Sequence, residues 1–300
     1  MSSVRANGVS IEYESLGSPK APAILLVMGL AMQLVAWPDS LCAGLVERGF
    51  RVIRFDNRDS GLSSKMRTNS LVPITARLAA AWFGLPVRAP YGLEDMAGDA
   101  IGLMDALDIR KAHVVGASMG GMIAQLMALD HPRRVASLTS IMSNTGERSL
   151  PGPKPSVAAA MMRRRSRRNR EEIVRGGVDL LRLIGSPAYP QSDEELRRLI
   201  ERSLERSYYP QGFYRQLLAI QTAPSRADRL RKLKVPTLVI HGQADPLIPV
   251  EAGKRTAALI PNARLRLIEG FGHDLPEALA PKLADLIAAH CAAAQLAHAA

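Results

Sequence analysis

The sequence predicts an α/β fold in which helices cover both faces of a mostly parallel, eight-stranded sheet. Apolar runs such as residues 23–28 alternate with stretches of helical periodicity such as residues 93–107, as expected for buried strands and the helices that cover them. The alternation stops at Ser143 and resumes at Thr237. The residues between these points are helical in pattern, polar and interrupted by prolines, which indicates an insertion after the sixth strand.

The first part of the chain begins with a predicted hairpin. Apolar and polar residues alternate at 9–14, and Asn7-Gly8 is a turn that joins this strand to residues 4–6. Further strands are predicted at residues 23–28, 51–56, 112–115 and 135–142. Helices are predicted at residues 38–48, 71–83, 93–107 and 119–129. In the third of these helices, Asp95, Asp99 and Asp105 are expected to face water.

The insertion separates this part from a shorter strand-and-helix segment. Its clearest helical patterns lie at residues 161–174 and 192–207. After it we expect strands at 237–241 and 264–268 and helices at 250–259 and 277–291. We therefore divide the chain into a core domain, residues 1–144 and 235–300, and an inserted helical subdomain, residues 145–234.

The positive charge of the chain is concentrated in the insertion. The formal net charge is +11, and residues 145–234 hold 20 Lys or Arg against 10 Asp or Glu, whereas the other residues hold 19 and 18. The densest basic run contains six arginines: Arg163, Arg164, Arg165, Arg167, Arg168 and Arg170. We interpret this run as a solvated face, with an anionic substrate or surface as the alternative. No aromatic residues are interleaved with it to stack on bases, so we expect no nucleic acid partner.

Cysteine usage and the apolar segments indicate a cytoplasmic protein. Cys42 and Cys291 lie far apart on predicted helices, which predicts free thiols in a reducing compartment. We find no metal-binding motif, so neither a metal nor another cofactor is expected. The first ten residues do not form a secretory signal, and the apolar run at 21–37 is too short and too interrupted for a membrane span. The pattern leaves open whether the chain forms a homodimer.

A strained turn is predicted where the strand at 112–115 meets the helix at 119–129. The sequence there is Gly116-Ala117-Ser118-Met119-Gly120, a Gly-x-Ser-x-Gly motif. A strand that becomes a helix within one or two residues forces its corner residue into a strained conformation, and flanking glycines leave room for it. Such a turn exposes the hydroxyl of Ser118 above the sheet as a candidate nucleophile.

Serine needs a base and an orienting carboxylate to become nucleophilic at neutral pH. Among six histidines, His273 is the one in a glycine-containing loop after a late strand, where active groups of α/β sheets gather. Asp245 follows the strand at 237–241 and is the predicted acid. Asp274 is the alternative acid, although we expect it to be solvated or to cap a turn. We expect His241 to be a satisfied buried group.

Two more acidic residues, Asp56 and Asp59, precede the Ser118 turn. We expect them to form turn hydrogen bonds with Arg58 and nearby backbone.

The order Ser118, Asp245, His273 resembles that of the α/β-hydrolase superfamily, and the resemblance covers nearly the whole chain. The inserted segment resembles the cap of that family. Three further motifs are similar to the aclacinomycin methylesterase-like branch of bacterial esterases: Val27-Met28-Gly29, Trp37-Pro38 and Arg54-Phe55-Asp56-Asn57-Arg58-Asp59-Ser60-Gly61. Met28 departs from the family, since many members have histidine before this glycine.

The resemblance implies a serine esterase that works through an acyl-enzyme, on a small-molecule ester. The backbone N–H groups of Leu30 and Met119 are the expected oxyanion hole. Lactonase, thioesterase and cofactor-free haloperoxidase activities use the same triad and stay open. A non-catalytic receptor or interaction module is disfavoured because all three triad residues are present.

Flexible and aromatic residues near the expected site are candidates for a substrate pocket, or else for ordinary packing. They are Gly29, Met32, Met142, Tyr208, Tyr209 and Phe213.

Overall fold

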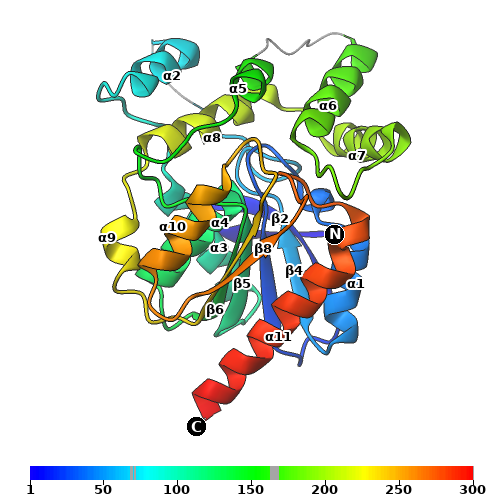
Figure 1. Cartoon of the computed structure of the whole chain (residues 1–300), viewed down its shortest axis with the longest axis vertical. Helices are drawn as coiled ribbons and strands as arrows, with labels where there is room; N and C mark the ends of the chain where they lie inside the picture. The colour runs from blue at the N-terminus through cyan, green and yellow to red at the C-terminus, as the bar shows by residue number, and fades with distance from the viewer. Residues whose placement is uncertain (68–69, 71, 163–168, 300) are drawn as a thin grey trace.

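One eight-stranded sheet organises the chain (Figure 1). In the computed structural model, which describes residues 1–67, 70, 72–162 and 169–299, the strand order is β1-β2-β4-β3-β5-β6-β7-β8. The strands are β1 (Ser2–Ala6), β2 (Val9–Leu16), β3 (Ala23–Val27), β4 (Arg51–Phe55), β5 (Ala112–Ala117), β6 (Val135–Ile141), β7 (Thr237–Gly242) and β8 (Arg264–Ile268). β2 is antiparallel to β1 and to β4, and the pairs from β4 to β8 are parallel. The predicted mostly parallel α/β fold is confirmed.

The helices follow the strands in the predicted order. The longer ones are α1 (Asp39–Glu47), α2 (Ile74–Trp82), α3 (Leu93–Ala106), α4 (Met119–Asp130), α5 (Pro155–Met162), α6 (Arg170–Ile184), α7 (Asp193–Arg206), α8 (Pro210–Thr222), α10 (Val250–Leu259) and α11 (Ala280–Ala299). The short ones are η1 (Leu34–Ala36), α9 (Ala227–Leu230) and η2 (Glu277–Leu279). Within the described chain, no helix combines the length and apolar character needed to cross a bilayer.

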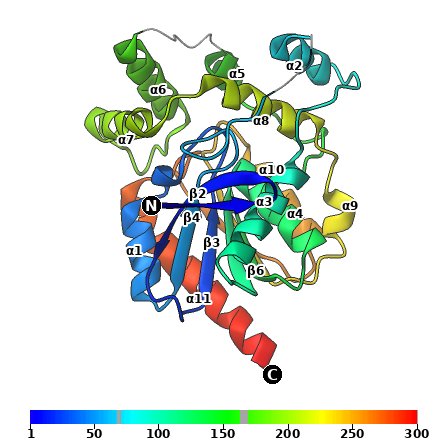
Figure 2. The ribbon, with the colours of Figure 1, turned by 180° about the vertical axis from the view of Figure 1, so that it is seen from behind.

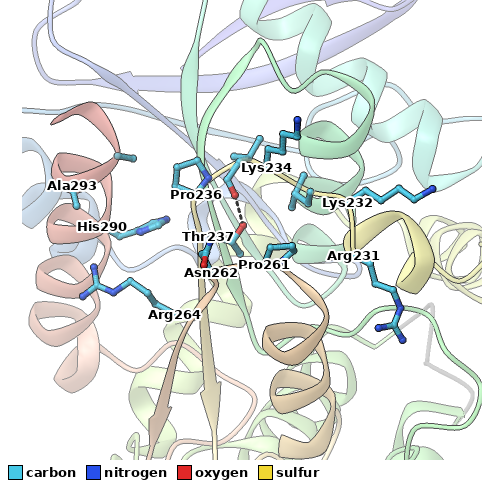
Figure 3. A pocket seen from close by; sticks show the side chains of 13 residues that line it. Arg231, Lys232, Lys234, Pro236, Thr237, Pro261, Asn262, Arg264, His290 and Ala293 are labelled. Carbon is cyan, nitrogen blue, oxygen red and sulfur yellow. Dashed lines mark hydrogen bonds between the residues drawn. The ribbon is translucent and has the colours of Figure 1, made fainter. Parts of the chain in front are cut away.

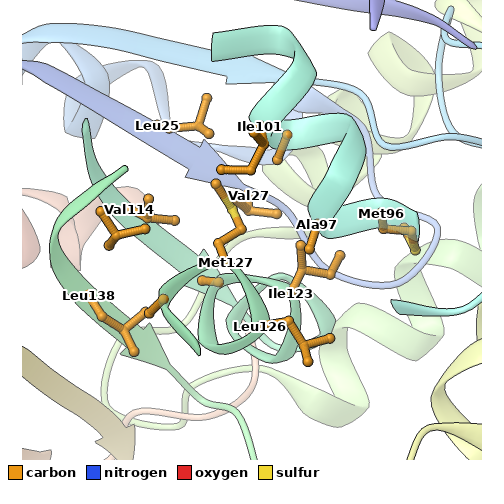
Figure 4. Packing of buried hydrophobic residues seen from close by; sticks show 14 of the residues in the cluster. Leu25, Val27, Met96, Ala97, Ile101, Val114, Ile123, Leu126, Met127 and Leu138 are labelled. Carbon is orange, nitrogen blue, oxygen red and sulfur yellow. The ribbon is translucent and has the colours of Figure 1, made fainter. Parts of the chain in front are cut away.

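Two apolar clusters sandwich the sheet. On one face, α3 and α4 pack on the central strands, where Val27, Val114 and Ile123 are fully buried (Figure 4). On the other face, α1 and α11 pack together and against the sheet. Cys42 and Cys291 lie in this second cluster as free, buried thiols. The double cover explains why β3 is apolar along its whole length and why every residue of β5, His113 included, is buried.

Helices α5 to α8 gather at one end of the molecule, and the C-terminal end of α11 lies at the other (Figures 1 and 2). α2, which comes from outside the insertion, joins this group because Leu78 and Ala81 pack with Leu218 of α8. The helices α6 and α7 form a hairpin whose Val174, Val178 and Leu196 make a small core of their own.

The prediction of one helix over residues 161–174 is wrong. α5 ends at Met162, and α6 begins at Arg170 behind an N-cap, Asn169, whose backbone is extended (φ −112°, ψ 111°). The Asn169 side chain accepts hydrogen bonds from the N–H groups of Glu171 and Glu172, which satisfies two donors of the first turn. Five arginines of the basic run, Arg163, Arg164, Arg165, Arg167 and Arg168, lie outside the described residues.

The prediction that Asp99 faces water is also wrong. Asp99 is buried, and both of its oxygens accept hydrogen bonds of 2.6 Å from the guanidinium of Arg58. Asn7 of the hairpin donates a further bond of 3.0 Å to Asp99. The expectation failed because helical periodicity does not reveal a cation that a distant loop supplies.

Breaking this pair should strongly destabilise the fold. In Asp99→Asn, Arg58 stays buried without a counter-charge, and we expect a loss of about 3–5 kcal/mol in the free energy of unfolding, measured by urea denaturation. The matched control is Asp105→Asn on the same helix, because the carboxylate of Asp105 pairs with Arg134 at the surface. Its loss should stay below about 1 kcal/mol. Equal losses in both variants would contradict this account.

Candidate active site

Ser118 stands at the corner between β5 and α4. Its backbone has φ 56° and ψ −122°, a left-handed conformation that is strained for serine. A Cβ on Gly120 would lie 1.9 Å from the carbonyl oxygen of Val27, and one on Gly116 would lie 2.1 Å from the carbonyl oxygen of Gly120. Glycine is therefore required at both positions, as predicted from the motif.

Three side chains from separate loops form a continuous hydrogen-bonded chain. The Oγ of Ser118 lies 2.9 Å from Nε2 of His273, and Nδ1 of His273 lies 2.8 Å from Oδ2 of Asp245. Asp245 and His273 are buried, and Ser118 is half-buried. The structure thus brings together the three residues that the sequence singled out, in the geometry of a nucleophile, a base and an orienting carboxylate.

Asp245 is fixed in its turn after β7. Its Oδ1 accepts hydrogen bonds from the N–H groups of Leu247 (2.9 Å) and Ile248 (2.8 Å), which leaves Oδ2 for His273. These donors stabilise the charged carboxylate beside the imidazole.

His241 lies below this carboxylate but does not replace His273. Its Nε2 donates to the carbonyl of Ile248 (2.8 Å), and burial lowers the pKa of His241, so the ring stays neutral. The expectation of a fully satisfied group is only half right: Nδ1 has no hydrogen-bond partner among the described residues. This atom faces Gly253 of α10, where a Cβ would approach it to 2.4 Å.

The loop after β3 runs beside Ser118. A Cβ on Gly29 would lie 3.1 Å from the Cβ of Ser118, so only glycine lets the loop pass this closely without displacing its neighbour. Within the described part of the chain, the N–H groups of Leu30 and Met119 donate to no other group. Both N–H groups are therefore available to another acceptor.

Several residues that support the site were missed by sequence reasoning. Asn57 donates to the carbonyl of Met28 (2.9 Å), and Gln216 of α8 accepts from the N–H of Ala31 (2.7 Å), so these two side chains hold the loop after β3. Ser143 donates to the carbonyl of Ser118 (2.8 Å). Their roles depend on contacts between distant segments. Asn57 lies in the motif at residues 54–61, but that motif does not reveal its contact with Met28, and no local motif marks Gln216 or Ser143.

The loop that carries His273 is held by the segment between α6 and α7. The N–H of His273 donates to the carbonyl of Ile184 (2.7 Å), and the N–H of Gly272 donates to Oγ of Ser186 (2.9 Å). Asp274 accepts hydrogen bonds from Ser186 and Gln191, and burial raises the pKa of Asp274. The expectation of a solvated or turn-capping Asp274 is wrong, because the insertion covers it.

Asp56 and Asp59 do more than stabilise their turn. Asp56 accepts from the N–H groups of Leu34 and Leu62, but it also pairs with Arg206 at the end of α7 (2.9 Å). Asp59 pairs with Arg215 of α8 (2.8 Å). The expected partner, Arg58, binds Asp99 instead. These buried ion pairs fasten the insertion to the core.

The predicted pocket residues divide into two groups. Gly29 lies beside Ser118, Met32 is half-buried and donates its N–H to the carbonyl of Gly29, and Met142 is buried directly after β6. In the insertion, the Tyr209 hydroxyl accepts from Arg215 (2.7 Å), and Phe213 is buried with its ring edge against Tyr214. Tyr208 is half-buried.

A cavity of about 700 Å³ lies at the opposite edge of the sheet. It is lined by the amino ends of β7 and β8, near Thr237 and Arg264, and by His290 of α11. Figure 3 shows Arg231, Lys232 and Arg264 pointing away from one another rather than converging. Among the described residues, no group of three or more His, Cys, Asp or Glu side chains is placed to hold a metal.

The chain matches one protein family and is similar to hydrolases of known name. A family model described as "alpha/beta hydrolase fold" matches residues 22–277. The rhodomycin D methylesterase DauP of Streptomyces sp. (strain C5) is 32% identical over 95% of this chain and 96% of its own length. The 2-hydroxy-6-oxononadienedioate/2-hydroxy-6-oxononatrienedioate hydrolase of Cupriavidus pinatubonensis is 30% identical over 57% of this chain and 59% of its own length.

Comparison with solved structures agrees on the fold. The meta-cleavage product hydrolase from Pseudomonas fluorescens IP01 superposes with a TM-score of 0.76 at 20% identity, covering 97% of each chain. At this identity the likeness speaks for the fold and not for the reaction.

The contacts of Ser186 lead to a prediction about the His273 loop. In Ser186→Ala the N–H of Gly272 loses its acceptor and Asp274 loses a donor, so amide hydrogen exchange at residues 270–274 should quicken about tenfold. Exchange is followed by mass spectrometry of the peptide that spans this loop. The control is Ser149→Ala, an exposed serine elsewhere in the insertion. Unchanged protection in Ser186→Ala would mean that the insertion does not hold the loop.

Proposed function

Because the chain belongs to the alpha/beta hydrolase fold family, we propose that it cleaves carboxylic esters with Ser118, His273 and Asp245 as its catalytic triad. Carboxylic ester hydrolase is the enzyme class into which the chain falls. The observation that carries the proposal is the hydrogen-bonded path from Ser118 through His273 to Asp245, with contacts of 2.9 and 2.8 Å.

The geometry supports a two-step acyl transfer. Nε2 of His273 takes the Ser118 proton as Oγ attacks the ester carbonyl, and it then gives the proton to the leaving alkoxide. Asp245 keeps Nδ1 protonated and stabilises the imidazolium. The N–H groups of Leu30 and Met119 hold the oxyanion, and water then releases the acid from Ser118 by the same path in reverse.

The relatives that match nearly the whole chain favour an ester with a small alcohol part. DauP is a methylesterase by name and matches nearly the whole chain, insertion included. A second candidate is the hydrolysis of 2-hydroxy-6-oxo-dienedioates, favoured by the relative from Cupriavidus pinatubonensis. That match covers 57% of this chain, against 95% for DauP, so it supports its own substrate class less strongly.

We further propose that residues 145–234 act as a cap that selects the substrate, with α2 as its outlying part. The ion pairs of Arg206 and Arg215 with the core, and the contacts of Ser186 with the His273 loop, support one fixed position of the cap over the site. Met32 and Met142 of the core and Tyr208 of the cap are the candidate substrate contacts. We expect the enzyme to act in the cytoplasm without a cofactor.

A substrate panel tests the proposed reaction. It comprises p-nitrophenyl esters of rising acyl length, methyl esters of bulky acids, lactones, thioesters and a 2-hydroxy-6-oxo-dienedioate. We expect the esters to be turned over fastest, and Ser118→Ala to lower kcat by about 10⁴-fold or more because no other nucleophile is in place. Ser149→Ala should match the wild type. Undiminished turnover by Ser118→Ala would refute the nucleophile.

A second pair of variants tests the acid. Asp245→Asn removes the acceptor that orients His273 and should lower kcat by about 10²–10⁴-fold. Asp274→Asn, at the neighbouring carboxylate, keeps an acceptor for Ser186 and should lower kcat less than about tenfold. The reverse ranking, measured with the same ester, would assign the acid role to Asp274.

A further inference from the structure

The side of α2 that faces away from α8 presents apolar side chains to solvent. Val72, Trp82, Phe83 and Leu85 are 54%, 68%, 79% and 59% exposed, and Ala76 and Ala79 between them are exposed as well. We call these six residues the α2 outer face. A surface helix ordinarily turns polar residues to water, and a contiguous apolar face marks an interaction site.

The other side of α2 is already used for packing. Leu78 and Ala81 lie against Leu218, and Arg77 is buried and donates to the carbonyl of Arg88. Gly84, with φ 75°, follows the end of the helix, and the N–H of Leu85 donates back to the carbonyl of Ala80, which fixes Leu85 beside the last turn. The packing of α2 against α8 in one orientation therefore determines which side chains of α2 are exposed.

Positive charge borders the α2 outer face. Nη2 of Arg148 lies 3.5 Å from the carbonyl of Ala81, beside the end of the helix, and Arg88 follows as an exposed side chain. The segments 60–92 and 148–170, which contain α2 and α5, have no Asp or Glu in their sequence. Their described residues include five exposed cations: Arg67, Arg88, Arg148, Lys154 and Arg170. Figures 1 and 2 show α2 and α5 along the same side of α8.

We propose that the α2 outer face docks the protein onto the surface of an anionic lipid bilayer. Tryptophan and phenylalanine are favoured at the level of the lipid headgroups, and nearby arginines bind anionic headgroups. A second copy of this chain is a poorer occupant, because a symmetric dimer would bring two cation-rich faces together. The docking is independent of the proposed ester hydrolysis and does not need a membrane-crossing helix.

The protein's two tryptophans make the docking measurable. Trp37 is fully buried, so a change in emission on adding vesicles reports Trp82. With vesicles of phosphatidylcholine and phosphatidylglycerol in a 3:1 ratio, we expect a blue shift, protection from iodide quenching and co-sedimentation. Phosphatidylcholine alone should bind at least about tenfold more weakly, and high salt should weaken binding to the anionic vesicles.

A double variant, Trp82→Ser with Phe83→Ser, tests the surface itself. We expect binding to fall about tenfold or more, because two aromatic side chains no longer insert. The control is Leu296→Ser on α11, a 74% exposed leucine far from α2, which should bind as the wild type does. A cooperative urea-unfolding transition with the wild-type midpoint, expected because both side chains are exposed, shows that the double variant is folded.

Three outcomes would overturn the docking proposal. One is equal binding to neutral and anionic vesicles, and another is undiminished sedimentation of the double variant. The third is a wild-type dimer in analytical ultracentrifugation that the double variant dissociates, with no vesicle binding, which would assign the face to self-association. Loss of ester turnover in Ser118→Ala has no bearing on these results, so the two proposals fail separately.

Discussion

A close approach of two backbones determines the geometry around Ser118. The first turn of α4 lies so near the end of β3 that Gly120 has no room for a side chain against the carbonyl of Val27. This approach holds Ser118 beside the loop after β3, where Gly29 and Leu30 lie. The order of the strands in the sheet then determines where the other two side chains of the site lie. β6, β7 and β8 follow β5 on its other side, so the loops that carry Asp245 and His273 reach Ser118 from that side.

The insertion is coupled to this geometry through buried polar contacts. Arg206 and Arg215 pair with carboxylates that have no exposure of their own, in the loop after β4. Burying such pairs costs desolvation that their attraction only partly returns, so they add little to stability. Their contribution is to fix the position of the insertion, because each pair is satisfied in one arrangement of α7 and α8. Asn57, in the same loop, donates to the carbonyl of Met28, so a shift of the insertion would reach the loop after β3 as well as the loop that carries His273.

Local patterns were enough to predict the sheet, the strained serine and the three side chains, Ser118, Asp245 and His273, that the structure brings into one hydrogen-bonded chain. Each depends on neighbours in sequence: glycines two positions from Ser118, or a polar loop directly after an apolar strand. Two of the failures have the opposite property, and the third comes from a local cap that periodicity does not register. The burial of Asp99 depends on Arg58, the position of Asp274 depends on Ser186, and the break before α6 depends on a single capping asparagine. A periodicity argument has no access to a partner about forty to ninety residues away, and it treats a capping residue inside a basic stretch as one more polar position.

Charge is distributed unevenly along the chain, and the distribution fits the two proposed tasks, ester hydrolysis and docking to an anionic bilayer. Outside segments 60–92 and 148–170 the chain holds 27 basic and 28 acidic residues, so the part that carries the triad is close to neutral. A neutral surround suits the proposed ester hydrolysis, in which charge would develop and disappear inside the site. The proposed oxyanion and imidazolium would then respond to the N–H donors and to Asp245 rather than to a large background field. The excess cations belong instead to these two segments. An anionic surface can therefore attract the cations of these segments. Salt screens the field of such a surface over about a Debye length, roughly 8 Å in physiological salt, so the field has little effect at Ser118.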